Sequence, residues 1–335
     1  MRTIHTAILW ALIGSAGLSI PMVLPARSVQ AQDIQNSEEA QARMQKGISL
    51  YQQSQYAAAL TELQFVAERY PNYGAAYRLA GLCQLQLQQY EPAVVSLKRA
   101  NELSMEQEKR EDSAARIALS RALFYAGKFE EAIPELTYAV SQKPNDATSH
   151  YLLGATHFQL KHEPEALASL SQAVTLNPKD LASWKLLTGI HLQRLAANPE
   201  DKTQLTKTQS TLQSLKSLDA SAESAGLAGQ FYLLTRQFAK AAPELEKAAT
   251  ASPDNGLIQF NLGIALSRSD QFAKAAPVLI RASELLPENT NVLKELGYVY
   301  EKDGKAEKAR AVYEKGDQLA NGQDEYFKTA LERVK

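Results

Sequence analysis

The sequence is poor in the residues that mark several common protein classes. It has one cysteine, Cys83, so no intramolecular disulfide can form. Lysine and arginine number 36 against 37 aspartate and glutamate residues, without a long run of either sign. Because nucleic-acid affinity depends on neutralising phosphates with clustered positive charge, this balance argues against a nucleic-acid partner.

Patterns that carry catalytic or metal chemistry are also missing. The chain has no GxSxG nucleophile turn, no phosphate loop ending in Gly-Lys-Ser or Gly-Lys-Thr, no HExxH motif and no cysteine-rich cluster. His150 and His157 share a helix face but stand two turns apart, roughly 10 Å at 1.5 Å per residue. That separation is too large for one metal ion. We therefore predict no catalytic residues, no cofactor, no metal site and no enzymatic activity.

The segment up to Ala31 differs from the rest of the chain. Arg2 precedes an apolar run from Ile4 to Ile20, and Val29–Ala31 places small residues at the two positions that a signal peptidase reads. We predict a signal peptide cut after Ala31 and an exported protein, periplasmic or secreted, with no stable membrane insertion after cleavage. An uncleaved membrane anchor stays open as the alternative, although the apolar run is short for a spanning helix.

A repeating unit recurs along the remainder of the chain. Its clearest copy, Ala147–Asp180, reads as two amphipathic helices joined by a short turn and closed by a proline. After a flexible lead-in at residues 32–39, an array of eight copies fills residues 40–323, and one further amphipathic segment follows at residues 324–335. The copies begin at residues 40, 74, 113, 147, 181, 222, 256 and 290.

Five positions of the unit keep the same kind of residue in most of the copies. Position 8 is small, position 20 is alanine, position 24 is large and apolar, position 27 is small and position 32 is proline. In the fourth copy these are Gly154, Ala166, Leu170, Ala173 and Pro178. Positions 20, 24 and 27 share one helix face because they are four and three residues apart. We expect the small residue at position 8 to let the second helix approach closely, with the alanine at position 20 sharing that contact.

This combination of positions resembles the tetratricopeptide repeat. The resemblance implies an all-α fold, a right-handed α-solenoid of about eight helix pairs with a C-terminal capping helix at residues 324–335. It also implies a non-catalytic scaffold that binds a protein or peptide partner in a concave groove, and with the export signal we place it in cell-envelope assembly. The alternative is an envelope factor that binds glycan or peptidoglycan with the same groove.

In the resembling family, positions 2, 5, 9, 12 and 13 of the first helices line that groove. Aromatic and arginine side chains favour the centres of interfaces. The candidate partner-binding residues in these columns are Tyr51, Arg78, Arg121, Phe124, Tyr125, Tyr151, Phe158, Lys185, Phe260, Arg268, Lys294 and Tyr298. An alternative for the aromatics at position 12 is a place in the core. The lysine and asparagine pattern with which some members hold a C-terminal carboxylate is absent, since Met44 and Ile48 occupy its columns in the first repeat.

Two segments depart from the pattern. In the fifth repeat, Asn198–Asp201 and a polar run to Ser217 replace the short turn and the alanine-rich second helix, which makes this repeat degenerate. Together with Asp219–Ala222 it is either a flexible joint or a lengthened, continuous repeat. The charged insertion Glu106–Asp112 predicts a longer loop or an extra helical turn.

The other departures are single residues. Pro134, Pro243 and Pro277 fall at position 22, inside the second helices, and predict a late helix start or a kink. His157 and His191 both stand at position 11, which is normally apolar, so we predict buried or half-buried structural histidines.

Overall fold

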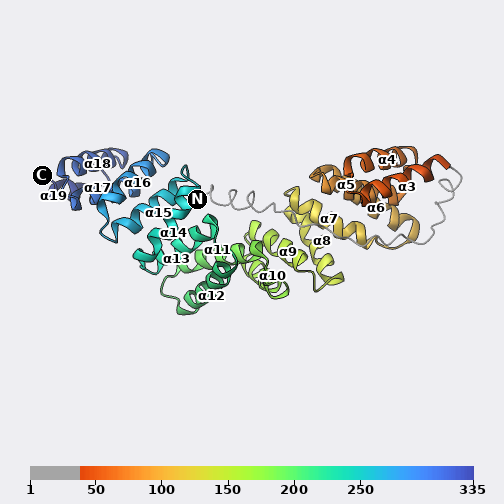
Figure 1. Cartoon of the computed structure of the whole chain (residues 1–335), viewed down its shortest axis with the longest axis horizontal. Coiled ribbons are helices and arrows are strands. Elements are labelled where there is room, and N and C mark those ends of the chain that lie inside the picture. Colours follow the sequence, from red (N-terminus) through yellow and green to blue (C-terminus); the bar gives the residue numbers. More distant parts are fainter. Residues whose placement is uncertain (1–37) are drawn as a thin grey trace. The chain divides into compact units, whose positions relative to one another are not determined.

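The computed structural model describes residues 38–335, and within this range every regular element is a helix (Figure 1). The first helices of the pairs are α3 (Glu38–Gln52), α5 (Gly74–Gln86), α7 (Ser113–Tyr125), α9 (Ala147–Gln159), α11 (Leu181–Ala197), α13 (Ala222–Leu234), α15 (Gly256–Ser267) and α17 (Thr290–Lys302). The second helices are α4 (Tyr56–Arg69), α6 (Tyr90–Glu108), α8 (Phe129–Gln142), α10 (Glu163–Leu176), α12 (Lys202–Leu218), α14 (Phe238–Ala251), α16 (Phe272–Leu285) and α18 (Ala306–Leu319), and α19 (Glu325–Arg333) follows them.

The start of the chain differs in part from the sequence prediction. The predicted signal peptide lies outside the described residues, as do residues 32–37 of the predicted lead-in. Helix α3 already begins at Glu38, so the last two residues of that lead-in are helical. The other seven first helices begin at the residues where the sequence places the repeat starts.

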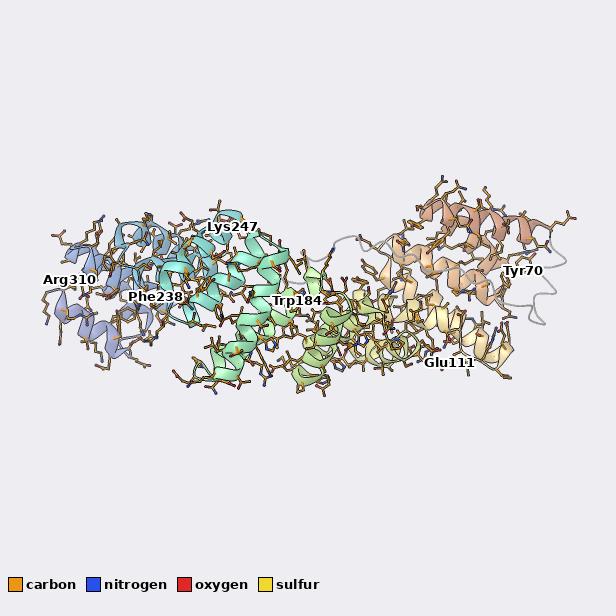
Figure 2. The ribbon with its side chains drawn as sticks, turned by 60° about the horizontal axis from the view of Figure 1, so that its bottom comes forward. Tyr70, Glu111, Trp184, Phe238, Lys247 and Arg310 are labelled. Atoms are coloured by element: carbon orange, nitrogen blue, oxygen red, sulfur yellow. The ribbon has the colours of Figure 1, made fainter. Side chains whose placement is uncertain are left out.

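The helices form two compact units, which we call unit 1 (up to Ser183) and unit 2 (from Trp184, labelled in Figure 2). In seven of the eight pairs, all except α11 and α12, the first helix packs closely against its own second helix. Successive first helices also contact one another, α3 with α5, α5 with α7 and α7 with α9 in unit 1, and α13 with α15 and α15 with α17 in unit 2. The predicted fold class, an all-α solenoid of helix pairs, is confirmed.

The small residue at position 8 makes room for the large residue at position 24. A Cβ atom built on Gly154 would lie 2.7 Å from Leu170 Cγ, and one built on Gly81 would lie 2.6 Å from Leu97 Cγ. Real Cβ atoms essentially never lie this close to another heavy atom. The absence of a side chain on the glycine therefore lets each fully buried leucine pack across the first helix. The closest contact is therefore with position 24, and the alanine at position 20 shares it at Ala59, whose carbonyl oxygen would lie 3.6 Å from a Cβ atom on Gly47.

Local hydrogen bonding fixes the ends of the helices. Asp146 caps α9 by accepting a hydrogen bond from the backbone N–H of Ser149, and the side chain of Asp112 caps α7 in the same way. In every pair except the fifth, the turn places position 15 in the left-handed region, as at Lys161 with φ 62°. There the N–H of His162 donates to the carbonyl of His157 at 2.8 Å and the N–H of Lys161 donates to the carbonyl of Phe158 at 3.0 Å, so two of the last carbonyls of the helix are satisfied.

The fifth repeat is a complete helix pair, which corrects the expectation that its second helix is replaced. Both α11 and α12 have 17 residues. The Nε2 atom of Gln204 donates to the Nδ1 atom and to the carbonyl of His191, 2.9 Å from each, and Thr208 donates to that same carbonyl. This buried polar network links the two helices where five of the other pairs have the glycine and leucine contact. A flexible joint at Asp219–Ala222 stays a prediction.

The remaining insertion extends a helix. Helix α6 has 19 residues, and its last turn includes Glu106, so the charged insertion adds a helical turn before the loop that leads to Asp112. The late start predicted at the position-22 prolines is wrong. The three helices that contain Pro134, Pro243 and Pro277 have 14 residues, as do α4 and α10, which have no proline there. All three prolines are exposed, so the carbonyl groups left without a donor can bind water. A kink stays a prediction.

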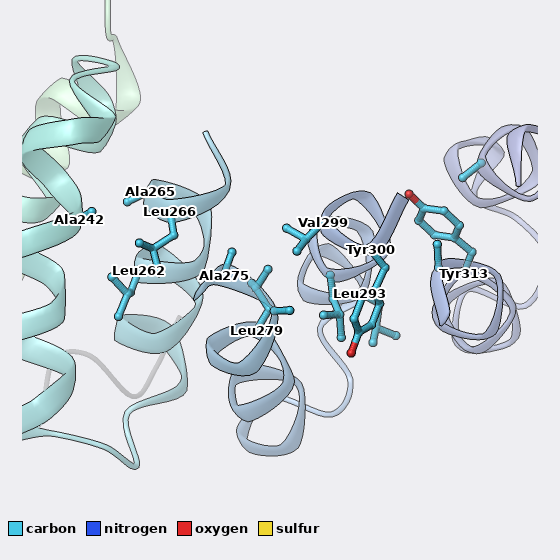
Figure 3. Close-up of a cluster of buried hydrophobic side chains, with 14 of the residues drawn as sticks. Ala242, Leu262, Ala265, Leu266, Ala275, Leu279, Leu293, Val299, Tyr300 and Tyr313 are labelled. Carbon is cyan, nitrogen blue, oxygen red and sulfur yellow. The ribbon is translucent and has the colours of Figure 1, made fainter. Parts of the chain in front are cut away.

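The final helix, α19, covers the end of the last pair. Phe327 is fully buried, and it occupies the space that a side chain on Gly316 would need. Its ring lies edge-on to Tyr313, with centroids 6.4 Å apart. Figure 3 shows part of the same core cluster, with Leu279 and Tyr313 among its labelled side chains.

Candidate functional site

Three of the predicted cationic residues are paired within the chain. Each stands at position 5 of a first helix. The aspartate that it contacts lies shortly before the start of the next first helix or, in the last repeat, shortly before the start of α19. The pairs are Arg78–Asp112 (2.9 Å), Lys185–Asp219 (3.1 Å) and Lys294–Asp324 (2.6 Å). Because an aspartate already offsets each charge, these side chains hold successive helix pairs together.

Arg268 is paired as well. Its Nη1 and Nη2 atoms donate to the two carboxylate oxygens of the buried Glu295, at 2.9 and 3.0 Å. The guanidinium also lies 5.1 Å from the ring centroid of Tyr298, and that ring packs edge-on against Phe272. Phe260 packs against the core of unit 2. The predicted residues of the seventh and eighth repeats therefore make their contacts inside unit 2.

Arg121 is different, because most of its donors are unused. Its side chain is only 12% exposed, and its one ion pair joins Nη2 to Asp146 Oδ2 at 3.9 Å, beyond hydrogen-bonding distance. The Nε and Nη1 atoms are buried and have no hydrogen-bond partner among the residues that the structure describes. Burial lowers the pKa of Arg121, and the nearby Asp146 opposes that shift. The group stays charged at neutral pH, since arginine is effectively always protonated.

Two tyrosines lie near this guanidinium, and a third lies near one of them. Tyr51 of α3 and Tyr125 of α7 both lie close enough to interact electrostatically with Arg121, and Tyr151 of α9 interacts with Tyr125. We call these four residues the Arg121 cluster. Burial raises the pKa of Tyr51 to about 12 and also raises the pKa of Tyr125 and of Tyr151, so all three hydroxyls are protonated donors at neutral pH.

The cluster reaches the surface at Tyr125, which is 45% exposed. The ring of Tyr125 stacks on Tyr90, with centroids 5.2 Å apart and planes at 24°. Tyr90 was not among the predicted residues because it is the first residue of a second helix, whereas all predicted groove residues belong to first-helix positions. Its position directly after the turn of the second repeat is the signal that could have identified it.

The alternative for the position-12 aromatics holds for Phe124. This side chain is 5% exposed and packs edge-on against Phe129 and Tyr125, so it belongs to the core. Phe158 and Tyr51 are half-buried, and Tyr51 packs edge-on against Tyr56. The Arg121 cluster therefore contains four of the seven candidates in unit 1.

The histidines take structural positions. His191 is buried at 8% exposure, whereas His157 is half-buried and its Nδ1 atom lies 3.5 Å from that of His162. Across residues 38–335, no three histidine, cysteine, aspartate or glutamate side chains are grouped so that they could hold a metal ion. Among the described helices, none has the length and apolar character needed to cross a membrane.

Comparison with known proteins places this architecture. A search of curated proteins finds no match. Of the solved structures, YrrB, described as a TPR protein with an unusual peptide-binding site, superposes with a TM-score of 0.52 at 15% identity, covering 59% of this chain and 97% of YrrB. MamA from Desulfovibrio magneticus RS-1 gives a TM-score of 0.46 at 18% identity, covering 55% of this chain and 99% of MamA.

A TPR protein from Parabacteroides merdae ATCC 43184 has a TM-score of 0.42 at 11% identity, covering 89% of this chain and 99% of its own. The structural likeness to YrrB shows the fold alone. The sequence profile of the tetratricopeptide repeat matches residues 44–102, 117–180 and 260–324, which is more than half of the chain. The chain therefore belongs to the tetratricopeptide repeat family.

Proposed function

We propose that this protein is a non-catalytic interaction scaffold that binds a peptide segment of a partner protein on the first helices of unit 1, at the Arg121 cluster. The tetratricopeptide repeat fold is that of a protein–protein interaction scaffold. The observation that carries the proposal is the buried guanidinium of Arg121, whose Nε and Nη1 atoms have no hydrogen-bond partner in residues 38–335. Unused buried donors are destabilising unless another molecule supplies their acceptors.

The surroundings of Arg121 support a peptide ligand. Consecutive first helices of unit 1 contact one another, so a segment lying across them meets side chains from several repeats. Tyr51, Tyr125 and Tyr151 each combine an aromatic ring with a hydroxyl group, and this combination is favoured at protein interfaces. YrrB, a protein of the same fold, is described as having an unusual peptide-binding site, and that likeness agrees with a peptide as the ligand here.

A peptide-selection experiment tests the proposal. The purified chain is immobilised and panned against a random twelve-residue peptide library, and affinities of the selected peptides are measured by fluorescence anisotropy. We expect Tyr125→Ala and Tyr151→Ala to weaken binding at least tenfold. Tyr298→Ala, which changes a half-buried tyrosine on a first helix of unit 2, is the matched control and should bind as the parent does. Failure to select any peptide, or equal binding by all four proteins, contradicts the proposal.

We further propose that the protein is exported and acts in assembly of the cell envelope. The support is the sequence of residues 1–31, with its apolar run and its small residues at Val29 and Ala31. Expression in a bacterial host followed by cell fractionation and intact-mass measurement is the test. A periplasmic or secreted product that begins at Gln32 is expected, whereas an uncut chain in the membrane fraction favours an anchor. Retention of exported polysaccharide in place of peptides would favour the glycan alternative.

A further inference from the structure

The turn of the fourth repeat brings two histidines together at the surface of unit 1. His157 stands at position 11, in the last turn of α9, and His162 stands at position 16, directly before α10. Their Nδ1 atoms lie 3.5 Å apart. His162 is exposed and His157 is half-buried, so solvent reaches the pair. Helix periodicity does not reveal this pair, because its members lie on either side of a turn.

The backbone of the turn fixes the approach of the two side chains. The N–H of His162 donates to the carbonyl of His157, and in this kind of helix ending the side chains at the two bonded positions are commonly in contact. Six other repeats form the same hydrogen bond between positions 11 and 16. In those repeats position 11 holds leucine, glutamine or tyrosine, and position 16 holds glutamine or lysine. The turn is therefore common to the array, whereas the histidine pair belongs to the fourth repeat.

The separation of the two Nδ1 atoms suits a metal ion better than a shared proton. At 3.5 Å it exceeds the usual range of an N–H hydrogen bond. Bonds from zinc to imidazole nitrogen are about 2.0–2.1 Å long, so a tetrahedral ion holds two such nitrogens roughly 3.3 Å apart. The exposed ring of His162 makes no hydrogen bond that caps α10, so a small rotation of this ring closes the difference.

The charges of the turn favour a cation. Glu165 interacts electrostatically with His157. Residues 157–165 contain Glu163 and Glu165 against a single basic residue, Lys161, which is exposed. Within residues 38–335 no third histidine, cysteine, aspartate or glutamate is grouped with the pair as a ligand. Water therefore fills the remaining coordination positions, as it does at open metal sites.

We propose that His157 and His162 form a two-histidine site for a divalent transition metal ion, bound through the two Nδ1 atoms. Imidazole nitrogen suits Zn²⁺, Cu²⁺ and Ni²⁺, and Cu²⁺ binds most tightly of the three. Mg²⁺ takes oxygen ligands and does not bind here. The site includes no residue of the Arg121 cluster, so it stands or falls separately from peptide binding.

Calorimetric titration of the full, untagged chain with ZnCl₂, and then with CuCl₂, tests the site. We expect the parent to bind one ion per chain that His162→Gln binds at least tenfold more weakly. Glutamine is the residue that four other repeats carry at position 16, so this variant keeps a turn that the array already uses. His157→Leu, which places the leucine of three other repeats at position 11, should show the same loss.

The matched control is His150→Gln, which changes another half-buried histidine of α9 and should bind as the parent does. Zn²⁺ should also raise the melting temperature of the parent, because an ion that binds only the folded chain stabilises it. EDTA should reverse that rise, and neither His162→Gln nor His157→Leu should show it. Circular dichroism checks that each variant is folded.

A transplanted pair tests whether the turn itself builds the site. Leu50→His combined with Gln55→His places histidines at positions 11 and 16 of the first repeat, where the N–H of Gln55 donates to the carbonyl of Leu50 at 2.9 Å. We expect this double variant to bind a second ion per chain.

Three results overturn the metal site. One is equal Zn²⁺ binding by the parent and His162→Gln. Another is a loss in His150→Gln as large as that in His162→Gln, because this would place the ion elsewhere on the chain. The third is Mg²⁺ binding as tightly as Zn²⁺, which would show that oxygen ligands hold the ion. Each of these leaves the peptide-binding proposal untouched.

Discussion

Unit 1 and unit 2 share one kind of core but use the charges on their first helices differently. In both, a small residue at position 8 lies beneath the side chain at position 24, as at Gly154 and Gly263. In unit 2, Lys185, Arg268 and Lys294 all pair with carboxylates of their own unit. In unit 1, Arg121 keeps two buried nitrogen atoms without an acceptor. The repeat pattern therefore builds the same helix scaffold in both units. The candidate binding site in unit 1 is distinguished by one arginine whose charge is not closely paired with a carboxylate.

Overpacking position 8 should break the shared core in either unit. Gly154→Leu and Gly263→Leu are each expected to reduce the free energy of unfolding by about 1–3 kcal/mol, because a Cβ atom at these positions already collides with a buried leucine. Urea denaturation measures the loss, and hydrogen exchange with mass spectrometry shows which unit opens. Gly189→Ala is the control, since its Cβ meets nothing within 4 Å. A loss confined to one unit would mean that the cores differ.

Acid should weaken unit 2 more than unit 1. Burial, with Lys207 and Arg194 nearby, lowers the pKa of His191 from 6.5 to about 4. A histidine whose folded pKa is depressed stays neutral in the native state and binds a proton only after unfolding. Its contribution is therefore complete above pH 6.5 and is lost as the pH falls toward 4, by roughly 3 kcal/mol.

Denaturant unfolding at a series of pH values checks this. His191→Asn keeps an acceptor for Gln204 without titrating, so its stability should fall less between pH 6.5 and 4. The pKa of His157 in unit 1 is also lowered by burial, but this side chain is half-buried only and should contribute less. An equal response of His157→Asn and His191→Asn would contradict the contrast between the units.

Removing a paired cation should be more destabilising than removing Arg121. Lys185→Met leaves the carboxylates of Asp219 and Glu223 without their cation, and we expect a loss of about 1–2 kcal/mol. Arg121→Leu removes a guanidinium whose buried donors are unmatched, so stability should be unchanged or higher. Thermal and denaturant melts compare the two. An equal loss in both variants would show that Arg121 is as well paired as Lys185.

The smallest expected effect concerns the turns, where the units should behave alike. Lys161 and Arg236 both adopt positive φ, at 62° and 55°. Replacing either with glycine removes that strain, and we expect a gain of about 0.5 kcal/mol in each unit after the extra freedom of the unfolded chain is counted. Gly127→Ala, at φ 74°, is the reverse control and should be destabilising. A loss on Lys161→Gly would show that its side chain makes a stabilising contact.

The parts of the structure that depend on local sequence were predictable. Helix pairs, their core faces and most first-helix starts follow from the spacing of residues such as Gly154 and Leu170, because each pair is specified within a single repeat. The second helix of the fifth repeat was not predicted because its core face carries the polar residues Gln204 and Thr208. These side chains can be buried only because they hydrogen-bond to His191 of the first helix. Pro134 was expected to delay or kink its helix; the helix starts without delay, because the exposed position of the proline tolerates the lost donor.

The sequence by itself determined that this chain is a stack of helix pairs, because a recurring unit with a small residue at position 8 and proline at position 32 leaves few other ways to bury the apolar faces. Only the tertiary structure distinguished Arg78 from Arg121, two arginines on first helices of the same unit. Pairing depends on whether a carboxylate of the next repeat comes within reach, and 2.9 Å for Arg78 against 3.9 Å for Arg121 is decided by how neighbouring helices pack.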